Sequence, residues 1–102
     1  MIKRLDVGAR MSEVAVHNGV AYLAGQVAED GSQDIGGQTR QVLAAIDALL
    51  ARVGSDKSKI LMTQIFLADL ADFPGQTPPR ATVQAALAKP DWKIEVVISA
   101  AV

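Results

Sequence analysis

The stretch VAVHNGVAYLA, residues 14–24, decides the fold because it predicts two antiparallel strands joined by a tight turn. Asn18-Gly19 at its centre is the strongest short signal for a β-hairpin, since both residues tolerate the positive φ angles of a type I′ turn. Gly25 and Gln26 close the second strand, and a glycine there allows another group to approach the backbone closely. The polar, glycine-rich residues 29–37 then predict a surface loop.

Downstream of the hairpin, residues 38–53 predict an amphipathic helix. Aliphatic residues at the i, i+4, i+7, i+8 and i+11 positions form one stripe of this helix: Val42, Ile46, Leu49, Leu50 and Val53. Gly54 is a natural residue just beyond the C-terminal end of such a helix.

Three further segments predict strands. Residues 59–67 are apolar on both faces, which predicts a central strand covered on both sides. Residues 81–87 give a weaker strand signal because of their alanines, whereas residues 93–101 alternate clearly. The order β-β-α-β-(connection)-β-β predicts an α+β fold with helix on one face of a sheet. The other face carries apolar residues such as Val27 and Val97, so we expect the sheets of several copies to cover it.

The composition is that of one small domain, residues 1–102. Half of the residues are hydrophobic but only 4% are aromatic, so the core must be aliphatic. The formal net charge of -1 and the scattered Lys and Arg residues argue against a nucleic-acid groove. The absence of cysteine and the single His17 exclude disulfides, thiol catalysis and sites that need two histidines.

The distribution of apolar residues also bounds the location. No apolar run approaches the roughly 20 residues of a membrane span. The first residues lack an apolar signal segment behind their charges. We therefore expect a cytoplasmic protein with no membrane partner.

Motifs in the same order along nearly the whole chain resemble the Rid family, also called YjgF/UK114. They are MSE at 11–13, YLAGQV at 22–27, QTRQVL at 38–43, FLADLADF at 66–73, PRATV at 79–83 and KIEV at 93–96. The resemblance implies a chorismate-mutase-like fold, β-β-α-β-(α)-β-β, whose sheets pack together in a homotrimer. It further implies that reactive enamines and imines are hydrolysed at the subunit interfaces to a 2-oxo acid and ammonia, with no cofactor and no metal.

The connection over residues 69–79 departs from this pattern, because it carries three prolines and no helical period. If the flanking strands are parallel, a crossover usually needs a dozen or more residues and a helix. The resemblance implies such a helix between Phe73 and Pro78, so about a dozen residues are missing. Either the chain has a true deletion, or its sequence skips a segment; the abrupt junction between residues 74–76 and 77–78 favours the second.

The resemblance assigns roles to five residues. Arg80, which follows two prolines, would bind the substrate carboxylate with its planar guanidinium. Glu95 would position the attacking water, and Gly25 would let backbone groups approach the ligand. Met11 and Thr82 occupy substrate-binding positions where the family often has a tyrosine and a cysteine, so a phenol and a thiol are lost here.

Ordinary structural roles remain open for the same residues. Arg80 could belong to a surface ion pair, Glu95 could pair with Lys93 across the interface, and Gly25 could simply end a strand.

Three functions also remain open. The leading hypothesis is an enamine/imine deaminase that acts on a small-molecule carboxylate. The second is a non-catalytic trimer that binds a 2-oxo acid, which the residues Met11 and Thr82 favour. The third, an endoribonuclease, is disfavoured by the net charge of -1, the lone histidine and the scarcity of aromatic residues for base stacking.

Overall fold

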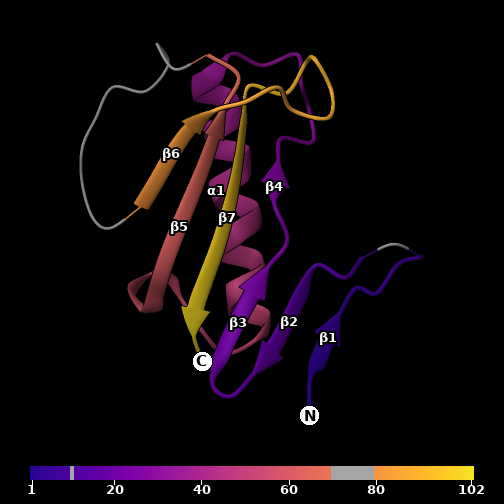
Figure 1. Cartoon of the computed structure of the whole chain (residues 1–102), viewed down its shortest axis with the longest axis vertical. Helices are drawn as coiled ribbons and strands as arrows, with labels where there is room; N and C mark the ends of the chain where they lie inside the picture. The colour runs from indigo at the N-terminus through magenta and orange to yellow at the C-terminus, as the bar shows by residue number, and fades with distance from the viewer. Residues whose placement is uncertain (10, 70–79) are drawn as a thin grey trace.

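The computed structural model describes residues 1–9, 11–69 and 80–102, which form one mixed sheet with a long helix on one face (Figure 1). The helix is α1 (Ile35–Arg52), and a short 3-10 turn covers Lys57–Lys59. The strands are β1 (Lys3–Leu5), β2 (Val14–His17), β3 (Val20–Leu23), β4 (Gln26–Val27), β5 (Ile60–Leu67), β6 (Arg80–Gln84) and β7 (Ile94–Ala101). Their order is β1-β2-β3-β7-β5-β6, and β4 pairs with β7 beside β3. The predicted α+β class is confirmed.

The predicted hairpin is confirmed as the pair β2–β3. His17 pairs with Val20 across a two-residue turn. Asn18 has a φ angle of 51° and Gly19 one of 77°, as a type I′ turn requires. The local sequence therefore sets both the turn and the strand register.

The helix α1 begins three residues earlier than residues 38–53 predicted. Asp34 caps it, because its side chain accepts a 2.8 Å hydrogen bond from the backbone N–H of Gly37. The sequence did not predict this start because Gly36 and Gly37 lie in the first turn, and glycine is a poor helix former. At the other end Gly54 has a φ angle of 75°, which confirms the predicted C-terminal residue.

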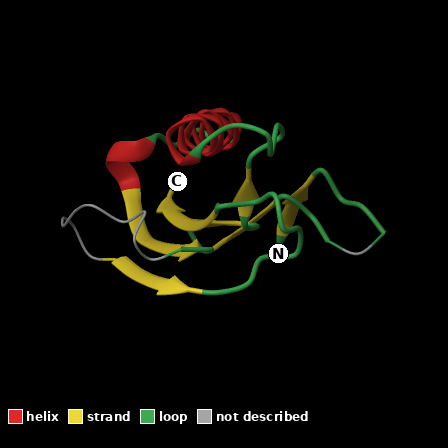
Figure 2. Ribbon diagram, turned by 90° about the horizontal axis from the view of Figure 1, so that it is seen from above, coloured by secondary structure: helices red, strands yellow, loops and turns green. Residues whose placement is uncertain are grey.

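The core lies between α1 and the near face of the sheet. The predicted alternation of β7 is confirmed, since Ile94, Val96, Ile98 and Ala100 are all buried. They pack with the predicted aliphatic stripe of α1. Figure 2 shows α1 on one side of the sheet and no described helix on the other.

Strand β5 lies between β7 and β6, as a central strand should. The prediction that it is covered on both sides is wrong for the single chain, because Leu61 and Met62 are 56% and 52% exposed. An apolar groove of about 330 Å³ runs beside α1 over β5 and β7, and Leu43, Ile60 and Ile65 are among its lining residues.

Strands β5 and β6 are parallel, with Thr63 opposite Arg80 and Leu67 opposite Gln84. Strand β6 is shorter than residues 81–87 predicted, and β1 and β4 were not predicted at all. The helix expected between Phe73 and Pro78 lies outside the described residues.

The face of the sheet away from α1 is open. Tyr22, Met62 and Val83 lie on it and are 54%, 52% and 42% exposed. Tyr22 of β3 and Met62 of β5 both pair with Ser99 of β7, so the two side chains flank Ser99 on this face. Among the described residues, nothing covers this apolar surface.

Candidate functional site

Glu95 stands on the open face of the sheet. Its neighbours Ile94 and Val96 are buried toward α1, so the alternation of β7 turns Glu95 the other way, where it is half-buried. Phe66 of β5 and Val27 of β4 are its partners across the strands. The carboxylate is therefore flanked by apolar side chains.

The backbone of Gly25 forms the surface against which the Glu95 carboxylate rests. A Cβ atom at position 25 would lie 2.1 Å from Glu95 Oε2 and 2.7 Å from Glu95 Cδ. Only glycine leaves this space to the carboxylate. The structure thus brings together Gly25 and Glu95, two of the five predicted site residues, although 70 positions separate them in the chain.

Two residues that the sequence did not single out, Glu13 and Gln26, hold the segment around Gly25. The amide nitrogen of Gln26 donates to Glu13 Oε2 and to the carbonyl oxygen of Ala24, each at 3.0 Å. The backbone N–H of Ala24 donates to the carbonyl oxygen of Glu13 at 2.9 Å. Nothing in the local pattern signals these contacts, because thirteen positions separate Glu13 from Gln26.

Strand β6 carries Arg80 and Thr82. The backbone of Arg80 pairs with Thr63; the predicted carboxylate contact of its side chain lies outside the described residues. Thr82 pairs with Ile65, which in turn pairs with Val96 on the face toward α1. Thr82 therefore lies on the opposite face of the sheet from Glu95. Its hydroxyl oxygen is buried and has no hydrogen-bond partner in the described structure.

Met11 lies at the other side of the molecule. It is 52% exposed and precedes β2, which is separated from β6 by β3, β7 and β5. Four strand spacings correspond to about 19 Å. Within one chain, Met11 is thus not brought together with Arg80 or Thr82.

The Glu95 carboxylate makes no ion pair or hydrogen bond to any part of the chain that the structure describes. The alternative in which Lys93 pairs with Glu95 across the subunit interface stays a prediction. Among residues 1–9, 11–69 and 80–102, no group of three His, Cys, Asp or Glu side chains could hold a metal ion. No described helix is long and apolar enough to cross a membrane.

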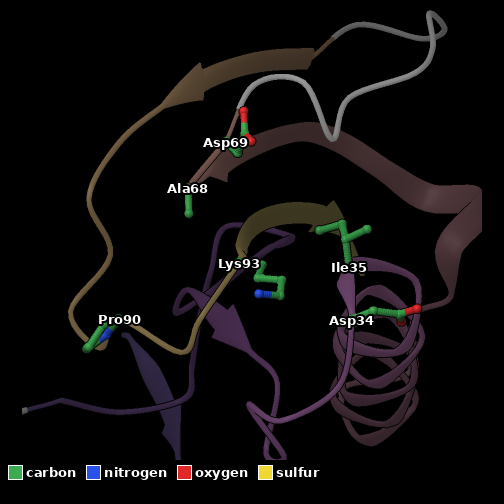
Figure 3. Close-up of a pocket in the computed structure, with 6 residues that line it drawn as sticks. All are labelled: Asp34, Ile35, Ala68, Asp69, Pro90 and Lys93. Atoms are coloured by element: carbon green, nitrogen blue, oxygen red, sulfur yellow. The ribbon is translucent and has the colours of Figure 1, made fainter.

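A separate pocket of about 370 Å³ lies where the N-terminus of α1 meets the ends of β5 and β7 (Figure 3). Its charged lining residues are Asp34, Asp69 and Lys93. Figure 3 shows the Asp34 carboxylate pointing away from the Lys93 ammonium, and Asp34 is already engaged as the helix cap. The charged groups do not point toward a common position, so this pocket lacks the geometry of a binding site for a charged ligand.

These features define a small α+β protein in which a sheet carboxylate rests on a glycine backbone. The family model described as Endoribonuclease L-PSP matches residues 1–102. A RutC family protein from Haemophilus ducreyi is 49% identical over 114 aligned residues, which cover 100% of this chain and 97% of that protein. The RutC family protein YoaB from Escherichia coli is 44% identical over 113 residues, with 99% and 98% covered. The chain belongs to the Endoribonuclease L-PSP family, also known as the Rid, YjgF or RutC family.

Solved structures support the same assignment. An uncharacterized protein from Pseudomonas aeruginosa has a TM-score of 0.91 and 42% identity, over 99% of this chain and 98% of that one. A YjgF family member from Neisseria meningitidis has a TM-score of 0.87 and 36% identity, over 99% and 94%. The alignment with the H. ducreyi protein has 114 positions against the 102 residues of this chain, so twelve positions have no counterpart here.

Proposed function

We propose that the protein is a cytoplasmic homotrimer that hydrolyses reactive enamines and imines to 2-oxo acids and ammonia. The observation that carries this proposal is the contact between Gly25 and Glu95. It leaves a carboxylate without a partner in the described structure, on a glycine backbone and among apolar neighbours. Such a carboxylate is free to accept a proton from water.

The reaction needs only residues of the chain and water. Arg80 holds the carboxylate of a 2-imino acid with two parallel hydrogen bonds. Glu95 accepts a proton as the water oxygen bonds to the iminium carbon. The proton then passes to the nitrogen, and the C–N bond breaks as the hydroxyl group gives up its proton to Glu95, which leaves a 2-oxo acid and ammonia. Glu95 returns this proton, the one that the iminium carried in, to water. Substrate and water together contain all the atoms of the two products.

The arrangement of the strands favours a site shared between subunits. Glu95 and Gly25 lie on the open face near the middle of the sheet, whereas Thr82 lies on the other face of the edge strand β6. One chain cannot close a small pocket around both. In a trimer, the glycine and carboxylate of one protomer can meet strand β6 of its neighbour.

The second candidate is a trimer that binds a 2-oxo acid without turnover. Met11 has no hydroxyl and Thr82 no thiol, so two groups often found in the family are lost. A binding pocket would survive these changes better than a reaction that depends on them.

We infer that the twelve positions without a counterpart in this chain belong to the connection between β5 and β6. That connection joins parallel strands, and a parallel crossover usually takes a dozen or more residues with a helix. Intact mass spectrometry tests the two origins. A mass of 10.7 kDa indicates a true deletion, and a mass higher by about twelve residues indicates a skipped segment.

A coupled assay tests the proposed activity. 2-Aminoacrylate is generated in situ, and pyruvate release is followed with wild-type protein and with Glu95→Gln. We expect wild type to accelerate release, and Glu95→Gln to lower the rate by about 100-fold or more. Binding of pyruvate without acceleration would favour the non-catalytic candidate, and absence of both would refute the site.

A further inference from the structure

We propose that Glu13 and Gln26 are positioning residues, and that their side-chain hydrogen bond holds the Gly25 backbone where it orients the Glu95 carboxylate. This inference rests on the proposed function, because it assigns a task to residues around the same carboxylate. Neither residue makes a hydrogen bond or an ion pair with Glu95 in the described structure, so both act through the backbone between them.

The pair encloses Gly25 from both sides. Before Gly25, Ala24 donates its N–H to the Glu13 carbonyl oxygen at 2.9 Å. After Gly25, Gln26 donates its side-chain amide to Glu13 Oε2 and to the Ala24 carbonyl oxygen, each at 3.0 Å. Both neighbours of the glycine are thus tied to one residue, Glu13.

Burial makes the loss of these hydrogen bonds costly. Gln26 is only 8% exposed, and Glu13 is half-buried. If the Gln26 amide lost its acceptor, it would be buried without a hydrogen bond, which is costly in free energy. The two side chains are therefore strongly held in the hydrogen-bonded arrangement. The glycine between them, which has the least intrinsic preference for any backbone conformation, takes its position from this pair.

The position of Gly25 is transmitted directly to Glu95. Gln26 pairs with Val96 and Val27 pairs with Glu95, so the braced segment continues into the ladder with β7. The Glu95 carboxylate occupies the space where a side chain at position 25 would lie. A shift of the Gly25 backbone therefore changes the orientations open to the carboxylate, and small misplacements of a catalytic group are costly.

The chemistry of the pair predicts which substitutions matter. Gln26→Glu places two carboxylates within hydrogen-bond distance and replaces attraction by repulsion. Adding Glu13→Gln to it restores a bond between the two side chains with donor and acceptor exchanged. The bond to the Ala24 carbonyl oxygen is not restored in the double variant, so the recovery is partial. Glu13→Ala removes the same acceptor without adding a charge.

The test measures kcat and KM in the pyruvate-release assay, and Gln41→Glu is the matched control. Gln41 also joins two segments through its amide, but to Asp30 and away from the site. We expect Gln26→Glu and Glu13→Ala to lower kcat by about 10- to 100-fold with KM changed by less than about threefold. The double variant should regain at least about tenfold over Gln26→Glu, and Gln41→Glu should stay within about twofold of wild type.

The possible failures are distinguishable. Wild-type kcat in Glu13→Ala, or no recovery in a folded double variant, overturns the positioning role. A loss equal to theirs in Gln41→Glu also overturns it, because any amide change would then suffice. A wild type no faster than Glu95→Gln overturns the proposed function itself, and the inference falls with it. Circular dichroism of each variant separates loss of fold from loss of turnover, and Glu13→Ala decides if Gln26→Glu does not fold.

Discussion

At the scale of single residues, the contact between Gly25 and Glu95 depends on the lack of a side chain at position 25. Gly25 and Glu95 are far apart in the chain, and only the pairing of β4 with β7 brings them into contact. The sequence could suggest Glu95 as a strand carboxylate and Gly25 as a point of close approach, but not that one rests on the other. The Glu13–Gln26 bond escaped prediction for the same reason, since the two residues stand in separate motifs and neither motif shows that their side chains meet.

Gly25→Ala should separate activity from stability. The new methyl group would collide with the Glu95 carboxylate, which is the mobile end of a flexible side chain and can swing aside. We expect kcat to fall by about 10- to 100-fold, while the free energy of unfolding in urea changes by less than about 1 kcal/mol. Gly36→Ala is the control, because a Cβ there meets its nearest atoms at 3.6 Å. Equal turnover in Gly25→Ala and wild type would contradict the contact's role.

Arg80 is predicted to anchor the carboxylate of the ligand. Two charge-assisted hydrogen bonds are worth roughly 1.5–3 kcal/mol each, so Arg80→Ala should weaken binding of pyruvate at least about tenfold. Arg80→Lys should not restore it, since a point charge cannot reproduce the planar fork. Titration calorimetry measures both, and Arg52→Ala serves as control because it removes only the ion pair with Asp6. Three equal affinities would make Arg80 a surface residue.

At the scale of elements, prediction succeeded where the signal was local. Asn18-Gly19 carries its own dihedral preference, and the aliphatic stripe of α1 and the alternation of β7 repeat often enough to be recognised. Strand β4 has two residues and exists only because β7 lies beside it. Strand β1 begins Lys-Arg, a polar pair whose strand conformation depends on β2. Such elements depend on tertiary contacts that no window of sequence contains.

Gln38 of α1 is hydrogen-bonded to the loop before the helix and to the segment before β7. We therefore expect it to contribute strongly to the free energy of unfolding. It is fully buried; its amide nitrogen lies 3.1 Å from the carbonyl oxygens of Gly31 and Gln33 and 2.9 Å from that of Asp91, and its oxygen accepts from the Lys93 N–H at 2.9 Å.

Gln38→Met keeps the shape but leaves these backbone groups unpaired, which should cost about 2–3 kcal/mol in urea unfolding. The exposed bonds of Gln41 make Gln41→Met the control, with an expected cost under about 1 kcal/mol. A cost for Gln38→Met no larger than the control's would show that water replaces the lost bonds.

At the scale of the whole molecule, three surface carboxylates should make stability sensitive to acid. The hydrogen bond from Arg52 lowers the pKa of Asp6, and hydrogen bonds from Ser32 and Ser58 lower the pKa of Asp30 and Asp56, each from an ordinary 3.8. Because these pKa values are lower in the folded state, the stabilisation is complete above the unfolded value. It is lost as the pH falls through the lower folded values.

Urea unfolding between about pH 7 and about pH 2.5 should therefore show a decline that begins near pH 4. Asp6→Asn should decline less steeply, because it removes one of the groups that must be protonated. The difference should be small and should shrink further in high salt, since the Asp6–Arg52 pair is exposed and screened. An equal decline in Asp6→Asn would mean that this pair contributes nothing.

The open sheet face predicts the oligomeric state. We expect light scattering at micromolar concentration to give three times the 10.7 kDa of one chain. Tyr22→Lys should dissociate the assembly, because it puts a charge among apolar residues that neighbouring copies would bury. Leu43→Lys is the matched control: Leu43 is 52% exposed, close to the 54% of Tyr22, but lies on α1. A stable monomer of the wild type would contradict the trimer.

The central position of β7 also has a consequence for how the protein is made. It follows every other described strand along the chain, yet it pairs with β3, β4 and β5 and packs against α1. Before β7 is synthesised, the hairpin β2–β3, the helix α1 and the pair β5–β6 lack the strand that joins them into one sheet. The growing chain therefore cannot complete the sheet stepwise, and its apolar segments stay exposed to aggregation until β7 has been synthesised.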